Sequence, residues 1–232
     1  LINCGLIFFK SNPNQLIDLI NRYQTLSKIP LANSIDGEWG VAMRIDSIQP
    51  FPLAMTLGAI QNDSLIYEMS KKIAEQCRLL GIHINFAPVL DVNNNPNNPI
   101  IGRRSFSESK EIVFRKSLAY MLGLQDQNIL ASGKHFPGHG DTSSDSHKTL
   151  PTVDFSAKRI DSIELYPYKT LIKEGLSSVM VAHLNIPSLE PRDGYPSSIS
   201  EHIVTNILKE RLGFKGLIFT DALNMKGAAN FS

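Results

Sequence analysis

Short apolar runs alternate along the chain with longer segments of helical period. The short apolar runs predict strands, and the segments between them predict helices. The strands are expected at Gly5 to Phe9, Leu31 to Asp36, Ile84 to Asp91, Ile129 to His135, Ser178 to His183 and Gly216 to Asp221. The helices are expected at Asn14 to Ser27, Ser64 to Leu80, Lys110 to Gln127, Ser156 to Glu174 and Ser200 to Leu212. This alternation indicates an α/β fold of βα units around a parallel sheet.

Residues at the ends of these elements refine the prediction. Ser64 and Ser200 stand where helix N-caps are expected, and Gly81 and Gly213 stand where helices commonly stop. Five predicted strands end in a polar residue: Asp36, Asp91, His135, His183 and Asp221. Both a (β/α)8 barrel and a doubly wound sheet build their sites at carboxyl strand ends, so the period does not distinguish them. The first predicted strand lacks a GxGxxG motif after it, which counts against a dinucleotide fold.

Composition and net charge limit the classes of molecule that the protein is expected to bind. The chain has 232 residues, of which 42% are apolar and 19% charged, as in an ordinary globular domain. Its net charge of +1 gives no electrostatic case for nucleic acid or anionic lipid, and favours a small neutral partner. Cys4 and Cys77 lack CxxC spacing and are predicted to be packing residues. No run reaches the roughly 20 apolar residues of a membrane span, so we expect none in this segment.

The densest polar cluster is the loop KHFPGHGDTSSDSHKTLP, from Lys134 to Pro151. It is too long for a plain connector, as is the Asn-rich loop at 93–101, so both are expected to be functional. Asp145 and His147 are two residues apart, close enough for the carboxylate to orient the imidazole. His147 is therefore a candidate general acid and base. On spacing alone, a solvated loop with incidental charges fits as well.

A metal site is the sharper alternative for this loop. The candidate ligands in it are His135, His139, Asp141 and His147. The first two would align at i,i+4 only on a helix, and the Pro and Gly residues between 137 and 140 disfavour one. We therefore expect no metal.

Three further segments supply charged residues, two of them at predicted strand ends and the third after the Asn-rich loop. GLIFTDALNM delivers Asp221, although a lone strand-end Asp also fits a helix N-cap. IDGEWGVAMR places Asp36, Glu38 and Arg44 after the second strand. GRRSF supplies Arg104, which alone would equally fit a surface charge.

In this order, the motifs resemble those of the bacterial β-N-acetylglucosaminidases of glycoside hydrolase family three. The likeness consists of a DxEGG-like segment, a GxRSF segment, the KHFPGHG loop with its DSH, and an aspartate in an apolar (S/T)D strand. It runs from about Leu6 to Gly227. The resemblance implies a (β/α)8 TIM-type barrel, with residues 1–232 forming a partial catalytic barrel domain of the N-terminal type.

The resemblance also implies a site. The nucleophile falls on Asp221 and the acid and base on His147, with Asp145 orienting that histidine. The implied substrate-binding residues are Asp36, Arg44, Arg104, Lys134 and His135. The reaction would be retaining hydrolysis of terminal non-reducing β-linked N-acetylglucosamine through an aspartyl glycosyl-enzyme. No cofactor is implied, and the expected substrates are muropeptides from peptidoglycan turnover or chitooligosaccharides.

Three positions depart from the family pattern. Trp39 replaces the first Gly of EGG, Arg103 replaces an Asp, and Ala222 replaces a second Asp after Asp221. The last change simplifies the choice of nucleophile. Trp39 could add a stacking face for a sugar, but fits a core or rim aromatic equally well. These departures bear on subsite preference more than on chemistry.

The sequence leaves several questions open. The chain starts inside an apolar run and ends soon after Asp221, so we expect a barrel fragment that lacks the first and last strands. The natural N-terminus would then lie upstream, and a fused C-terminal domain would lie outside this segment. The compartment, cytoplasmic or periplasmic, is undetermined. A metal-dependent hydrolase, an inactive sugar-binding module and transfer to phosphate instead of water remain alternatives.

Overall fold

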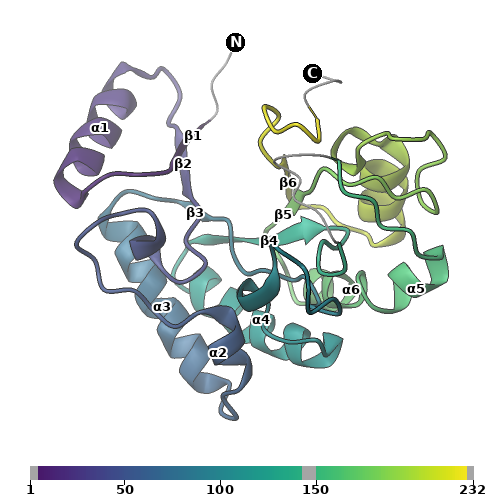
Figure 1. Cartoon of the computed structure of the whole chain (residues 1–232). Coiled ribbons are helices and arrows are strands. Elements are labelled where there is room, and N and C mark those ends of the chain that lie inside the picture. Colours follow the sequence, from purple (N-terminus) through teal and green to yellow (C-terminus); the bar gives the residue numbers. More distant parts are fainter. Residues whose placement is uncertain (1–4, 143–149, 229–232) are drawn as a thin grey trace.

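The computed structural model describes residues 5–142 and 150–228. Within them a parallel six-stranded sheet forms the centre, and each strand pairs with the next along the chain. The strands are β1 (Gly5–Phe8), β2 (Ala32–Ile35), β3 (Ile84–Asn85), β4 (Leu130–Phe136), β5 (Ser178–Val181) and β6 (Leu217–Thr220). The sheet curls like half of a barrel (Figure 1). All the carboxyl ends of its strands therefore lie along one rim.

Helices connect the strands and cover the outside of the sheet (Figure 1). The α-helices are α1 (Pro13–Leu26), α2 (Ala54–Gly58), α3 (Ser64–Leu79), α4 (Lys110–Gln125), α5 (Ala157–Ser162) and α6 (Tyr166–Lys173). Shorter 3-10 turns are η1 (Val41–Met43), η2 (Gly102–Arg104) and η3 (Ser197–Ile199), and η4 (His202–Arg211) is a wide π-type helix. The predicted α/β fold is confirmed.

Five of the six predicted strands are confirmed to within two residues at either end. The exception is the strand predicted at 84–91, because β3 pairs regularly only at Ile84 and Asn85. Pro88 has no backbone N–H to donate, so a regular ladder cannot pass through it. The chain nevertheless stays beside β4, since Lys134 N–H donates to Pro88 O (3.2 Å) and Leu90 N–H donates to Lys134 O (2.6 Å).

The single helix predicted at 156–174 is wrong, because the structure has two helices there. Pro167 stands in the first turn of α6, where its missing N–H costs nothing. In a continuous helix its ring would clash with the carbonyl of Ile163, four residues earlier. The proline therefore ends the first helix and starts the second.

The predicted helix ends are mostly confirmed. Gly81 and Gly213 follow α3 and η4 with φ of 72° and 70°, a conformation that favours glycine. The Ser200 hydroxyl accepts from Ile203 N–H (3.1 Å), as a cap does. Ser64 is wrong as an N-cap, because it is the first residue of α3 and Asp63 precedes it. The Asp63 carboxylate does not cap the helix, since it pairs instead with basic side chains of α4.

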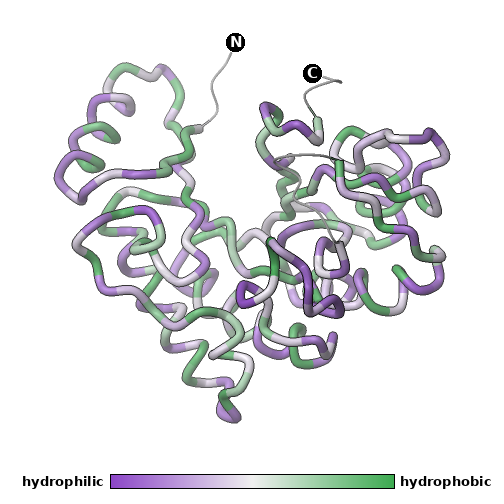
Figure 2. Tube along the Cα trace, viewed as in Figure 1, coloured by the Kyte–Doolittle hydropathy of each residue, from purple (hydrophilic) through white to green (hydrophobic). Residues whose placement is uncertain are grey.

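The core lies between the sheet and its helices, and Figure 2 shows hydrophobic residues along the central strands and polar ones in many outer loops. Helices α3 and α4 approach closely at Gly123, where an added Cβ would lie 2.4 Å from Tyr67 O. Cys77 of α3 is fully buried, as predicted for a packing residue, and burial raises the pKa of its thiol to about 12. Cys4 lies outside the described residues. Among the described helices, none has the length and hydropathy needed to cross a membrane.

Candidate functional site

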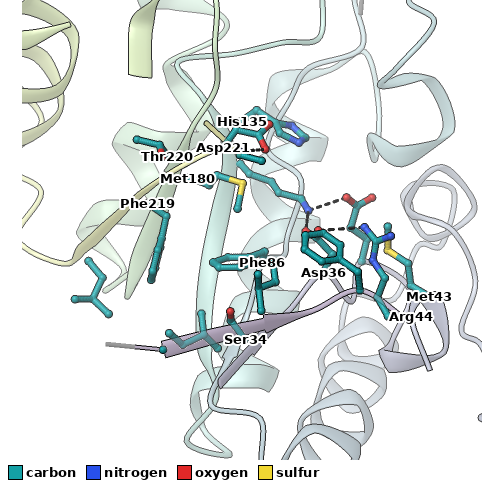
Figure 3. A pocket seen from close by; sticks show the side chains of 18 of the residues that line it. Ser34, Asp36, Met43, Arg44, Phe86, His135, Met180, Phe219, Thr220 and Asp221 are labelled. Atoms are coloured by element: carbon teal, nitrogen blue, oxygen red, sulfur yellow. Dashed lines mark hydrogen bonds and ion pairs between the residues drawn. The ribbon is translucent and has the colours of Figure 1, made fainter. Parts of the chain in front are cut away.

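Charged side chains meet at the carboxyl rim of the sheet, around a cavity of about 870 Å³. Figure 3 shows Asp36, His135 and Asp221 around it, although they come from three different strands: His135 lies in β4, and Asp36 and Asp221 directly follow β2 and β6. Six residues predicted from the sequence line this cavity: Asp36, Arg44, Arg104, Lys134, His135 and Asp221. The curl of the sheet brings them together, because the carboxyl ends of parallel strands share one rim.

Four of these side chains, with Glu38, form a ladder of alternating charge. Arg44 Nη2 lies 3.1 Å from Asp36, whose other oxygen lies 2.8 Å from Lys134 Nζ. Lys134 also lies 2.8 Å from Glu38 Oε1. Arg104 donates two hydrogen bonds to the Glu38 carboxylate, of 2.7 and 3.0 Å. Every charge in the ladder thus has a partner of opposite sign.

Burial and ion pairing shift the pKa values of the ladder's carboxylates and of Lys134 in opposite directions, and the effect of pairing is the larger. Burial alone would raise the pKa of Glu38, but Lys134 and Arg104 outweigh it and hold that pKa well below its ordinary value. The pKa of Asp36 is lowered in the same way, against burial, by Lys134 and Arg44. Burial alone would lower the pKa of Lys134, yet Glu38 and Asp36 raise it. All of these groups are therefore charged near neutral pH.

Lys134 and His135 are consecutive in β4, and both line the cavity. In a regular strand, successive side chains point to opposite faces. The pairing of β4 with β5 is irregular between Gly133 and Phe136, as at a β-bulge. The irregularity turns both polar side chains toward the same site.

Asp91 contacts the histidines of the site, and its side chain is fully buried. Its carboxylate lies 2.6 Å from His135 Nδ1 and accepts from His139 N–H at 2.7 Å. His135 Nε2 lies 3.2 Å from Arg104 Nη2, which can only donate. His135 Nε2 therefore accepts, and His135 Nδ1 carries the proton toward Asp91. Burial alone would raise the pKa of Asp91, but the two histidines lower it.

Asp221 directly follows β6 and is half-buried. Its backbone N–H donates to Val181 O (2.9 Å), which extends the β5–β6 ladder to this residue. Its Oδ1 accepts from the Ala222 N–H at 2.8 Å. The backbone of Asp221 is thus tied to β5, and one oxygen of its carboxylate is held by the next backbone N–H.

Asp145 and His147, the other two predicted catalytic residues, lie outside the described residues. Sequence reasoning missed the supporting roles of Glu38 and Asp91, although both stood in segments already singled out. Trp39 is not among the residues that line the cavity, whereas Phe9, Phe86 and Phe219 are. Phe9 is 53% exposed and lies under the Arg44 guanidinium, at the mouth of the site.

The predicted loop after β4 is confirmed over its described residues 137–142, which form no helix, and residues 143–149 of it lie outside the described part of the chain. The His135 and His139 rings lie edge to face with centroids 6.0 Å apart. His139 Nδ1 contacts Thr142 Oγ1 at 2.6 Å. Over residues 5–142 and 150–228, no group of three or more His, Cys, Asp or Glu side chains is arranged to hold a metal ion.

A parallel α/β domain with charged hydrogen-bonding groups around a rim cavity defines a class of proteins that bind small polar ligands at strand ends. The comparison with known families is more specific. The model of the glycosyl hydrolase family 3 N-terminal domain matches residues 4–232. The chain belongs to this family.

Relatives within the family agree. "Beta-hexosaminidase A" of Pseudoalteromonas piscicida is 37% identical over 98% of this chain and 42% of its own length. A family 3 β-N-acetylglucosaminidase from Paenibacillus sp. has a TM-score of 0.92 and 39% identity, covering 98% of this chain and 44% of that one. NagZ from Neisseria gonorrhoeae, in complex with N-trifluoroacetyl-D-glucosamine, has a TM-score of 0.88 and 32% identity, covering 95% and 67%.

The chain spans only part of the curated relatives that it matches. The share is 42% of the Pseudoalteromonas protein and 64% of the "Beta-hexosaminidase" of Thiobacillus denitrificans.

Proposed function

We propose that this protein is a retaining glycoside hydrolase that removes terminal non-reducing β-linked N-acetylglucosamine. One observation carries the proposal. Asp221 and the charge ladder of Asp36, Lys134 and Arg104 line a single cavity, although they lie far apart in the sequence. A carboxylate facing a set of sugar-hydroxyl ligands is the arrangement that a covalent glycosidase needs.

In the proposed reaction, Asp221 attacks the anomeric carbon. We assign the attack to Oδ2, because Oδ1 already accepts from Ala222 N–H. The bond from the anomeric carbon to the leaving oxygen breaks, and His147 gives that oxygen a proton. Neutral His147, oriented by Asp145, then takes a proton from water as the water attacks the same carbon and releases the Asp221 carboxylate. The sugar retains its β configuration.

The remaining rim residues hold the sugar. The carboxylate of Asp36 accepts hydrogen bonds from hydroxyl groups, and Arg44, Arg104 and Lys134 donate to sugar oxygens. His135 presents Nε2 to the cavity, with Asp91 fixing its tautomer. A cavity of about 870 Å³ has ample room for one N-acetylhexosamine and part of its aglycone.

We take the substrate class from the relatives. One relative is called a β-N-acetylglucosaminidase. The structure of NagZ was solved in complex with an N-acylated glucosamine. N-acetylglucosaminyl muropeptides are the leading substrate and chitooligosaccharides the next. Asp221 and His147 supply the nucleophile and the proton of the proposed reaction, so we expect it to need neither a metal nor a cofactor.

We also propose that the six strands are part of a (β/α)8 barrel, of which residues 1–232 are a partial domain. The support is the curl of the sheet, its strand order, and the exposure of both edge strands: Ile7 of β1 is 40% exposed and Leu217 of β6 is 50% exposed. Unpaired edges of this kind favour aggregation. A sharp, cooperative thermal transition of residues 1–232 alone would argue against the proposal.

The decisive assay uses the full-length protein on a muropeptide and on chitobiose, with NMR of the first-formed sugar. We expect the β anomer of N-acetylglucosamine, no turnover by Asp221→Ala, and normal turnover by Asp18→Ala, which changes an exposed aspartate of α1. The α anomer would refute the retaining mechanism. Binding without turnover would favour an inactive sugar-binding module, and activity that zinc restores after chelation would favour a metal-dependent hydrolase.

A further inference from the structure

His183 is a buried histidine that the proposed mechanism does not use. It lies two residues past β5 and its side chain has no exposure to solvent. Its Nε2 lies 3.0 Å from Ala222 O, and its Nδ1 lies 2.6 Å from Ser198 Oγ. Both ring nitrogens are therefore engaged, one of them by the residue that follows Asp221.

The partners fix the tautomer. A carbonyl oxygen can only accept, so the His183 Nε2 must carry a hydrogen and donate it to Ala222 O. In the neutral ring, Nδ1 then accepts from the Ser198 hydroxyl. The His183 ring thus accepts a hydrogen bond from Ser198 in η3 and donates one to the backbone that follows β6.

Ala222 connects this link to the carboxylate of Asp221. Its N–H donates to Asp221 Oδ1 at 2.8 Å, while its carbonyl accepts from His183 and also from Met225 N–H at 3.0 Å. The two carbonyl contacts fix the turn that follows β6. A rotation of Ala222 would move the N–H that holds the carboxylate.

The position of β6 makes this restraint matter. Within the described sheet β6 pairs with β5 alone, and its residues are exposed or half-buried. The β5–β6 ladder ends with the Asp221 N–H bond to Val181 O. Beyond that bond, the His183 side chain bonds the turn to the body of the domain through Ala222 O.

We infer that His183 is a positioning residue, which holds the Asp221 carboxylate at its angle of attack through the carbonyl of Ala222. The inference rests on the proposed role of Asp221 as nucleophile. Reacting groups must be aligned closely, and a displacement of about 1 Å can cost on the order of 10²-fold in rate. His183 should therefore affect the formation of the glycosyl-enzyme rather than the binding of the sugar, which we assign to the charge ladder around Asp36, Lys134 and Arg104.

Two substitutions separate positioning from general support. In His183→Gln the amide nitrogen occupies roughly the place of Nε2 and can still donate to Ala222 O. In His183→Asn the shorter amide reaches only toward Ser198 and loses the carbonyl. The matched control is His83→Asn, since His83 bonds a backbone N–H at the amino end of β2, away from the site.

The measurement is the rate at which a saturating 5-fluoro-N-acetylglucosaminyl fluoride labels the full-length protein, followed by intact-mass spectrometry. Calorimetry gives the affinity of each variant for N-acetylglucosamine. We expect His183→Asn to label on the order of 10²-fold more slowly, with unchanged affinity, and His183→Gln and His83→Asn to label nearly as fast as the parent.

Two results would overturn the inference. If the parent is labelled on Asp221 and His183→Asn is labelled equally fast, His183 does not position the nucleophile, and the proposed function stands. If both His183 variants lose labelling and affinity together, its role is general support of the fold. A parent that turns over substrate but is labelled elsewhere than Asp221 refutes the proposed function itself.

Discussion

Replacing Glu38 by Gln should destabilise the protein strongly while leaving its shape intact. The Glu38 side chain is 5% exposed and stands between Lys134 Nζ at 2.8 Å and the Arg104 guanidinium at 2.7 Å. Glutamine fills the same volume and keeps one oxygen acceptor. The substitution therefore removes a buried negative charge and little else.

The magnitude follows from what each cation retains. Lys134 keeps Asp36 at 2.8 Å, but the hydrogen-bond contacts given for Arg104 that remain are to uncharged groups, Ile100 O at 3.3 Å and His135 Nε2 at 3.2 Å, and the carboxylates of Asp91 and Asp36 attract it only from farther away. Removing one partner of a buried ion pair costs about 3–5 kcal/mol. Because the amide still accepts a hydrogen bond, we expect about 3 kcal/mol, the lower end of that range. In a domain of this size, that corresponds to a fall in Tm of roughly 6–12 °C.

Denaturant unfolding of the full-length protein measures the cost, with Glu75→Gln as the matched control. Glu75 also pairs with a lysine, at 2.9 Å, but its side chain is 55% exposed, so its loss should change stability far less. Equal losses in the two variants would refute the reasoning, because they would show that burial of the Glu38 pair adds nothing.

The pH dependence gives an independent check with a definite sign. The pKa of Glu38 lies well below its ordinary value of 4.5 in the folded protein, so the folded state resists protonation. Its stabilising effect is present above pH 4.5 and is lost as the pH falls toward the folded pKa. The gap between the parent and Glu38→Gln should therefore be largest near neutrality and shrink below pH 4.5. A gap that stays constant from pH 7 to pH 3 would contradict the assignment.

Three further outcomes follow from the proposed site. In His147→Ala, an activated aryl glycoside should react much faster than a natural disaccharide, and added azide should yield a β-glycosyl azide; equal losses on both substrates and no azide product would move suspicion to His135 or His139. Asp145→Asn should lose less activity than His147→Ala, because the imidazole stays in place; a larger loss in kcat would show that Asp145 does more than orient it. Chelator treatment should leave kcat unchanged, whereas loss of activity that zinc restores would mean that the His-rich loop holds a metal.

The fold was largely predictable because its signals are local. Apolar runs mark strands, and the errors in the extent of strands and helices fall at prolines. Pro88 shortens β3 and Pro167 divides the helix predicted at 156–174. Both prolines were visible in the sequence, but each breaks a ladder or a helix only in its three-dimensional setting, where it meets a neighbouring strand or an earlier carbonyl.

The site was predictable as a set of residues, but its internal support was not. Six of the eight predicted site residues line one cavity, and the other two lie outside the described residues. Several partners of those six come from distant parts of the chain, as with Arg104 and Glu38, which are 66 residues apart, or His135 and Asp91, which are 44 apart. Such pairs depend on the curl of the sheet and on the irregular register of β4, and neither leaves a periodic signal in the sequence.

The central claim is that Asp221 forms the bond to the sugar. The direct measurement is peptide mapping of the full-length protein after it has been trapped with 5-fluoro-N-acetylglucosaminyl fluoride. The account predicts one added glycosyl group, on the peptide that contains Asp221 and on that carboxylate. An adduct on Asp36, Glu38 or Asp141, or rapid turnover of the probe in Asp221→Ala, would contradict it.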